Sequence, residues 1–352
     1  MSATSRQLAR ALEAWFERAQ RDLSWRRTRD PYAIWVSEIM LQQTRVQTVE
    51  AYYGDFLRRF PTVDLLAAAD EDDVLRAWSG LGYYRRARLL HRGARYVAGE
   101  LGGELPREVK ALRRVPGVGP YTAGAIAAIA FDQPEPLVDG NVARVLSRIY
   151  AVSEPAQQQA KASHHWEKTR AILAEGTPRV LAQSLMELGA TVCTPRAPNC
   201  LACPVRDLCR AQADDLTDQI PAPRRRTPSP TEHLWALALC WGGRTLLYRR
   251  PAEGLLAGMW CLPLMLRGVR ASRPDLARLA ALTGAEIELD AAACPPLKHV
   301  FTHRIWQLTP WRVRLLEPPR AKIDGHAWAT ATKLPAGGIP SVTTKLLRAV
   351  KA

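Results

Sequence analysis

Apolar side chains recur every three to four residues through most of the first two hundred positions, which is the spacing of helices that bury one face. This spacing predicts helices over residues 8–16, 33–46, 74–78, 89–97, 123–129, 142–149 and 180–188. Asp30 and Pro31 precede the second helical segment. Aspartate caps helix starts and proline fits the first turn, so a helix is expected to begin there. The first part of the chain is therefore expected to be all-α.

The pattern changes after residue 217. Residues 218–231 contain four prolines and three consecutive arginines, which cannot continue a helix and have little to bury. Beyond them, strand-like runs at 234–241 and 245–248 flank a Gly-Gly pair, the signature of a hairpin.

Residues 305–316 predict another strand, and residues 274–282 predict a helix. We therefore expect three parts: a helical domain over residues 1–217, a linker over 218–231 and a smaller α+β domain over 232–352.

Composition is that of a globular protein, with 47% hydrophobic and 24% charged residues in a chain of 352. No apolar run approaches the roughly 18 residues of a membrane helix, and the N-terminus lacks the apolar core of a signal peptide. We expect a cytoplasmic protein without a membrane segment. The net charge of +15 favours a polyanionic partner such as nucleic acid, although solubility alone also explains a basic chain. Residues 226–352 carry 18 basic and 8 acidic side chains, which supply ten of these charges.

Four of the seven cysteines lie within seventeen residues, at Cys193, Cys200, Cys203 and Cys209. Without a secretion signal, such a group indicates a metal site more than disulfides. Zinc modules usually have two short cysteine pairs, and the spacing C-x6-C-x2-C-x5-C has one. Four thiolates also suit a 4Fe–4S cluster, so the chemistry leaves zinc open and favours the cluster.

A glycine-rich turn interrupts the helical pattern in Leu112-Arg-Arg-Val-Pro-Gly-Val-Gly-Pro-Tyr-Thr-Ala-Gly-Ala-Ile126. Gly117 and Gly119 allow close approach to a ligand, and the helix that follows presents free amides that suit a phosphate. A purely structural turn between two helices is the alternative.

Two carboxylates stand out in the helical part. Glu38 lies in Trp35-Val-Ser-Glu-Ile-Met-Leu-Gln-Gln-Thr44, among large apolar residues. Burial there would raise its pKa toward the range of a general acid, whereas a solvent-facing polar stripe is the alternative. Asp139 stands immediately before a predicted helix, so it is a helix cap, a catalytic carboxylate, or both.

Together, these four motifs resemble the A/G-specific adenine DNA glycosylases, the MutY family. The turn resembles the helix-hairpin-helix of DNA repair glycosylases, and the cysteine spacing matches the cluster loop of the endonuclease III superfamily. The acidic residue at position 38 separates this family from endonuclease III. Endonuclease III also has a nucleophilic lysine where this chain has Tyr121, which implies a monofunctional glycosylase.

The resemblance implies a role for each matching residue. Glu38 would protonate the adenine. Asp139 would stabilise the oxocarbenium-like sugar, either electrostatically or through a transient covalent adduct. Tyr121 and Asn141 would line the pocket, with a 4Fe–4S cluster on the four cysteines.

Further residues would contact the DNA. Gln43, Leu81 and Tyr83 would wedge into the duplex beside the flipped adenine, and Trp25 and Arg26 match a segment near the base. For Tyr83 and its neighbour Tyr84, core packing is the alternative. Gly117 and Gly119 would lie against a phosphate.

The C-terminal part resembles the Nudix-type domain of the same family. Phe301, Thr302 and His303 match the loop that reads 8-oxoguanine, with threonine where the family usually has serine. The acidic Nudix metal motif is missing, because Asp275 is the only acidic residue between positions 266 and 284. This domain should therefore recognise DNA and not hydrolyse nucleotides.

The expected partner is double-stranded DNA with A:8-oxoguanine or A:G mispairs, bound by a monomer in the bacterial cytoplasm at the nucleoid. Two other functions remain open: a glycosylase for another lesion on the same scaffold, and a DNA-binding module without catalysis.

Overall fold

A computed structural model describes residues 3–154, 163–223, 228–268, 271–319, 323–330 and 333–350. The chain divides into two compact units. The first, here the helical unit, comprises Met1–Ala68 and Arg85–Arg226, and the second, the sheet unit, comprises Ala69–Tyr84 and Thr227–Ala352. The three arginines of the expected linker, at 224–226, lie outside the described residues, so the linker boundaries stay a prediction.

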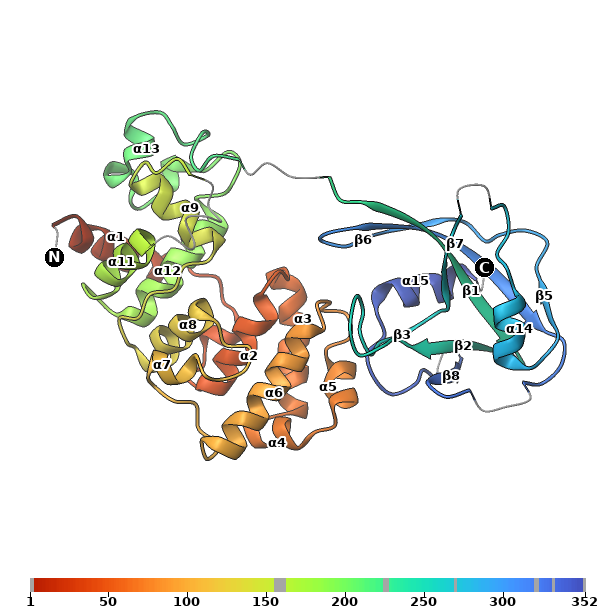
Figure 1. Cartoon of the computed structure of the whole chain (residues 1–352). Coiled ribbons are helices and arrows are strands. Elements are labelled where there is room, and N and C mark those ends of the chain that lie inside the picture. The colour runs from red at the N-terminus through yellow and green to blue at the C-terminus, as the bar shows by residue number, and fades with distance from the viewer. Residues whose placement is uncertain are drawn as a thin grey trace. The chain divides into compact units, whose positions relative to one another are not determined.

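The described part of the helical unit consists of helices and short 3-10 turns (Figure 1). The α-helices are α1 (Ala3–Ala19), α2 (Pro31–Leu41), α3 (Val46–Arg59), α4 (Val63–Ala68), α6 (Arg85–Glu100), α7 (Val109–Leu112), α8 (Pro120–Phe131), α9 (Gly140–Ile149), α11 (Ser163–Leu173), α12 (Pro178–Thr191) and α13 (Arg210–Ala213). The 3-10 turns are η1 (Ser24–Arg26), η2 (Cys200–Ala202) and η3 (Arg206–Leu208). None of the described helices is both long and apolar enough to cross a membrane.

One predicted helix was wrong in extent. Residues 33–41 form most of α2 and residues 42–45 form a turn, because α2 ends at Leu41 and α3 starts at Val46. Between them Gln43 adopts a φ of 57°, the left-handed region that interrupts a right-handed helix. Neither glycine nor proline marks this break in the sequence. The apolar spacing therefore predicted one helix through it.

Helix α2 is buried on every side in its central part. Asp30 caps it by accepting from the Tyr32 and Ala33 amides at 3.0 and 3.3 Å. From Tyr32 to Met40 every residue is buried, and α2 packs against α8. The α8 backbone lies so close to its neighbours that a Cβ on Gly124 would sit 1.9 Å from the Pro136 carbonyl oxygen. Glu38 is therefore buried, and the alternative of a solvent-facing polar stripe is wrong for this residue.

The sheet unit is built on one mixed sheet with a helix on each face. Its strands are β1 (Thr231–Trp241), β2 (Arg244–Arg249), β3 (Trp260–Cys261), β4 (Leu264–Leu266), β5 (Ile287–Leu289), β6 (Leu297–Val300), β7 (Ile305–Leu315) and β8 (His326–Ala329). The central strands β1 and β7 run parallel, and the other strand pairs are antiparallel. Helix α15 (Ser341–Ala349) contributes to the apolar cluster on one face and α14 (Ala277–Thr283) to the cluster on the other.

The predicted hairpin between β1 and β2 is present, with Gly242 and Gly243 at φ values of 52° and 72°. The predicted helix at 274–282 was placed slightly early, because α14 begins at Ala277.

Residues 69–84, including α5 (Glu71–Ala77), belong to the sheet unit, although the sequence placed them within the helical domain. The Tyr84 hydroxyl donates to the Ile339 carbonyl at 2.8 Å, and the Arg249 guanidinium lies 2.5 Å from the Asp72 carboxylate. This segment therefore brings Tyr83 into the same unit as Thr302.

Candidate active site

Glu38 lies in the interior of the helical unit, with 5% of its surface exposed. The Tyr121 hydroxyl, from the first turn of α8, donates to Glu38 Oε2 at 2.9 Å. Burial raises the pKa of Glu38 to about 7; the Tyr121 hydrogen bond opposes this shift and the nearby Asp139 charge adds to it. A buried carboxyl with this pKa holds a proton near neutral pH and can donate it.

Asp139 is the N-cap of α9, which confirms the first of its two expected roles. Its carboxylate accepts from the Asn141 and Val142 amides at 2.9 and 2.7 Å and from the Asn141 side chain at 3.1 Å. Burial raises the pKa of Asp139 above its ordinary value, against the effect of these hydrogen bonds and of Arg144. The Asp139 charge acts on both Glu38 and Tyr121, so the three side chains lie near one another in the helical unit.

Arg26 is held by a carboxylate that sequence reasoning missed. Arg26 Nη2 lies 2.8 Å from Glu187 Oε2, and Arg21 donates three further hydrogen bonds to the same carboxylate, one from its backbone amide and two from its side chain. Burial would raise the pKa of Glu187, but the hydrogen bonds from Arg21 and Arg26 outweigh it and lower the pKa to about 2. The available signal was a lone charge inside the apolar run of α12, but nothing in the sequence indicated its partners, more than 160 residues away.

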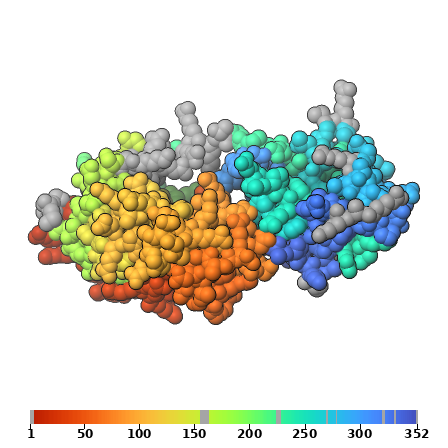
Figure 2. All heavy atoms as spheres, turned by 60° about the horizontal axis from the view of Figure 1, so that its bottom comes forward, coloured from red at the N-terminus to blue at the C-terminus, as the bar shows by residue number. Residues whose placement is uncertain are grey.

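The helix-hairpin-helix turn lies between α7 and α8, with Gly117 and Gly119 exposed and Val115 and Val118 buried. Gly117 has a φ of 84°, and a Cβ there would lie 2.8 Å from the Leu89 Cβ, so glycine is required for both reasons. Gly119 caps α8 and faces open space. In the space-filling view, the orange to yellow part of the chain forms one continuous part of the surface, although most of α8 is buried beneath it (Figure 2).

Of the three predicted wedge residues, two are exposed. Gln43 and Tyr83 are exposed and adopt left-handed backbone conformations, with φ values of 57° and 48°. Leu81 is buried, with 5% of its surface exposed. Tyr84 is the member of the tyrosine pair that packs in the core, so Tyr83 is available at the surface.

The predicted lesion-reading turn connects β6 to β7. Thr302 and His303 are exposed, and the Thr302 hydroxyl is hydrogen-bonded to the Tyr83 hydroxyl at 2.9 Å. Phe301 is partly buried, with its ring against Trp306. The turn thus presents two polar side chains at its tip and holds an aromatic one beneath.

The four clustered cysteines follow α12 and are free thiols, each partly buried. Burial raises the pKa of Cys203 to about 11, and charges on the other three add to the effect. Arg148 donates to Cys193 Sγ at 3.3 Å. Among the described residues, no three His, Cys, Asp or Glu side chains are grouped closely enough to bind one metal ion.

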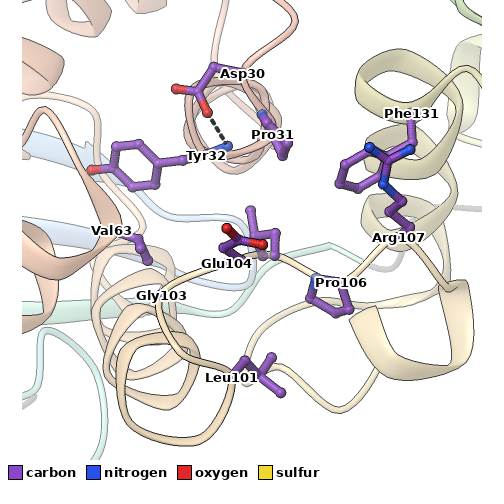
Figure 3. Close-up of a pocket in the computed structure, with 11 residues that line it drawn as sticks. Asp30, Pro31, Tyr32, Val63, Leu101, Gly103, Glu104, Pro106, Arg107 and Phe131 are labelled. Atoms are coloured by element: carbon purple, nitrogen blue, oxygen red, sulfur yellow. Dashed lines mark hydrogen bonds between the residues drawn. The ribbon is translucent and has the colours of Figure 1, made fainter.

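A separate open cavity of about 640 Å³ lies elsewhere in the helical unit. Figure 3 shows Asp30 and Glu104 among its lining residues. The Arg107 guanidinium lies 5.2 Å from the centre of the Phe131 ring. None of the predicted site residues lines it.

Comparison with known proteins adds a family to this geometry. Residues 36–170 match the HhH-GPD superfamily of base excision DNA repair proteins, and residues 234–349 match the NUDIX domain. An adenine DNA glycosylase of Rattus norvegicus is 34% identical, over 96% of this chain and 77% of its own length. The chain belongs to the adenine DNA glycosylase family. An adenine DNA glycosylase of Homo sapiens is 38% identical over 72% of this chain, and the match spans 56% of that protein.

Solved structures place this adenine DNA glycosylase family member on the expected scaffold. The structure of a thermostable thymine-DNA glycosylase is 28% identical, with a TM-score of 0.56 over 60% of this chain and 97% of that chain. Endonuclease III in a non-covalent DNA complex has a TM-score of 0.51 at 21% identity, over 61% of this chain and 99% of that chain, a likeness of fold alone. The predicted architecture, a helical helix-hairpin-helix domain followed by a smaller Nudix-like α+β domain, is confirmed.

Proposed function

We propose that the chain flips adenine out of A:8-oxoguanine or A:G mispairs and removes it by hydrolysis, leaving an abasic site. Membership of the adenine DNA glycosylase family supports the substrate. The observation that carries the mechanism is Glu38, a buried carboxyl whose pKa of about 7 suits a proton donor at neutral pH.

Glu38 acts as the general acid in this mechanism. Protonation of the adenine ring makes the base a neutral leaving group, so cleavage of the bond to the sugar needs less charge separation. Tyr121 orients the carboxyl through the 2.9 Å hydrogen bond, and burial excludes competing water from the proton.

Asp139 stabilises the positive charge that develops on the sugar as the base leaves. Burial disfavours its ionised form in the free protein, and a cationic sugar nearby would favour ionisation again. Asn141 orients Asp139 through backbone and side-chain hydrogen bonds, and Arg144 in turn donates to the Asn141 side chain at 2.9 Å.

The reaction is proposed to be monofunctional, because Tyr121 supplies no amine for a Schiff base and the first lysine of the chain is Lys110. Borohydride should therefore not trap an enzyme–DNA adduct efficiently. Efficient trapping would show that a lysine acts as nucleophile.

The four cysteines would hold a 4Fe–4S cluster. Burial and the charges of neighbouring cysteines raise the pKa of Cys200, Cys203 and Cys209, so the iron of a cluster would stabilise thiolates that burial and mutual repulsion disfavour. The cluster's role here is structural: it would fix a loop that carries the exposed Arg196, Arg206 and Arg210 toward phosphates.

Metal analysis tests this assignment without any activity measurement. The purified protein should contain about four iron and four sulfide per chain. Stoichiometric zinc with no iron, in protein from iron-replete cells, would contradict the cluster.

The DNA interface would combine backbone contacts and base contacts. Gly117 and Gly119 would approach a phosphate at the start of α8. Gln43, Leu81 and Tyr83 would fill the space left by the flipped adenine, and Leu81 would have to leave its buried position to do so.

Thr302 and His303 would read the base opposite the adenine, with Phe301 as their anchor. We propose that the protein acts as a monomer in the bacterial cytoplasm. A relative in Buchnera aphidicola subsp. Baizongia pistaciae, 32% identical over 70% of both chains, is consistent with that setting.

Strand cleavage at the adenine after alkali treatment of an A:8-oxoguanine duplex tests the function. We expect cleavage with A:8-oxoguanine and, more slowly, with A:G, and none with an A:T pair. Binding without base release would favour the DNA-binding module, and release of a different base would favour a glycosylase for another lesion.

A further inference from the structure

The turn that carries Thr302 and His303 is closed at its base by the backbone. The Phe301 amide donates to the Arg304 carbonyl at 2.9 Å, so the two exposed residues stand at the tip of a four-residue turn. The turn is short, so a shift of Arg304 must displace the tip as well.

Aromatic rings support the turn from beneath. The Phe301 ring meets the Trp306 ring edge-on at 4.7 Å, and the His299 ring contacts Phe301 at 4.5 Å. Trp306 is 3% exposed, so it is a fixed point in the sheet rather than a mobile surface group. The position of Trp306 therefore determines where Phe301 lies.

Glu232, the second residue of β1, binds two of the residues that support the turn, Arg304 and Trp306. It stands opposite Trp306 in the parallel β1–β7 register. Its Oε2 accepts from Trp306 Nε1 at 2.7 Å, and its Oε1 accepts from Arg304 Nη1 at 2.8 Å. Each carboxylate oxygen thus holds a different residue of the turn's base, and the ion pair with Arg304 is about one-third exposed on either side.

We propose that Glu232 is a positioning residue for recognition of the base opposite the adenine. This inference rests on the proposed function, in which Thr302 and His303 contact that base. A base-edge hydrogen bond requires its donor and acceptor to be placed within about 0.5 Å, which a supporting carboxylate can ensure. Glu232 also neutralises Arg304, so the guanidinium stays at the base of the turn instead of binding DNA phosphates without regard to sequence.

Three variants of the full chain test the role of Glu232. Glu232→Gln removes the charge at nearly constant size, and Arg304→Gln removes the partner on the turn. The matched control is Glu288→Gln, which breaks the exposed ion pair between β5 and Arg314 in the same sheet. The measured quantities are dissociation constants at one fixed salt concentration. The duplexes carry a non-hydrolysable adenine analogue opposite 8-oxoguanine or guanine, and a third duplex has only normal pairs.

Glu232→Gln and Arg304→Gln should each reduce the preference for 8-oxoguanine over guanine by about tenfold, the effect of one good base-edge contact. Binding to the normal duplex should not weaken in Glu232→Gln, because no phosphate contact is lost and the released Arg304 guanidinium can only add one. Glu288→Gln should keep the wild-type preference.

An unchanged preference in both variants would overturn the proposal, as would an equal loss in Glu288→Gln or an equal loss of affinity for all three duplexes. Failure of the proposed function looks different, because the wild-type chain itself would then release no adenine and show no preference between the two mispairs. Thermal unfolding identifies any variant that has not folded. If either Glu232→Gln or Arg304→Gln fails to fold, the base preference of the other one tests the proposal.

Discussion

The proposed catalytic pocket and the proposed lesion-reading turn place their key side chains in opposite environments. Glu38 has 5% of its surface exposed, and burial is the main cause of its raised pKa. Thr302 and His303 are exposed, and what is buried is their support, Trp306. Proton transfer benefits from a site that excludes water and shifts a pKa, whereas recognition needs polar groups that reach the partner from a fixed base.

This difference implies that the two regions fail in different ways. A change in the pocket should alter the rate of base release with little effect on binding. A change in the turn should alter discrimination and leave the chemistry in place. The predictions below test this separation.

The largest effect is expected from Glu38→Gln. The change removes a proton donor and little volume, so adenine release should fall by ~10²–10⁴-fold while duplex binding stays within about twofold. Single-turnover kinetics and a binding titration measure the two quantities. The control is Glu167→Gln on the exposed face of α11, which should behave as wild type. A Glu38→Gln rate within about tenfold of wild type would mean that the proton comes from elsewhere.

A cut near Pro223, which removes the C-terminal part, should have the next largest effect. The remaining chain keeps Glu38 and Asp139 and should still release adenine. Binding to every duplex should weaken and the preference for 8-oxoguanine should collapse, because residues 226–352 supply ten of the fifteen net charges and the reading turn. The cut also removes the Thr302 partner of Tyr83 and the Ile339 partner of Tyr84. Retention of the wild-type preference by the shortened chain would assign discrimination to the helical domain.

Thr302→Ala combined with His303→Ala in the full chain should reproduce only the loss of discrimination. We expect a decrease of about 1–3 kcal/mol in the preference for 8-oxoguanine, the value of one good base-edge contact. The salt dependence of binding should be unchanged, because neither side chain is expected to neutralise a phosphate. His326→Ala, on β8, is the control. A changed salt dependence with an unchanged preference would make the turn a clamp on the DNA backbone.

The smallest effect concerns the pH dependence of the wild type and of Tyr121→Phe. Adenine release should fall as pH rises through about 7, because the protonated form of Glu38 is then lost. The Tyr121 hydroxyl donates to the carboxylate and so stabilises its ionised form. Its removal should raise the pKa of Glu38 further and move the decline to higher pH. A profile that stays in place would show that another group controls it.

The sequence predicted what depends on neighbours along the chain. Apolar residues around Glu38 indicated its burial, and the position of Asp139 before a helix indicated its cap. The end of α2 at Leu41 was not predictable from apolar spacing, because a left-handed Gln43 carries no glycine or proline signal. Contacts between distant segments were also missed.

Glu187 binds Arg26 across 161 residues, and Glu232 binds Arg304 across 72. Pairs of this kind depend on helix packing and strand register, which no local pattern specifies. The grouping of residues 69–84 with the sheet unit depends on the same kind of distant contact, here with Ile339.

The separation between pocket and turn is tested most directly by single-turnover adenine release from A:8-oxoguanine and A:G duplexes under one set of conditions. The chains to compare are the wild type, Glu38→Gln and the Thr302→Ala/His303→Ala double variant. We predict that the wild type releases adenine faster opposite 8-oxoguanine and that Glu38→Gln is slow on both duplexes. The double variant should release adenine from both at similar rates. A double variant that keeps the wild-type ratio, or a Glu38→Gln variant that keeps the wild-type rate, would contradict the division of labour proposed here.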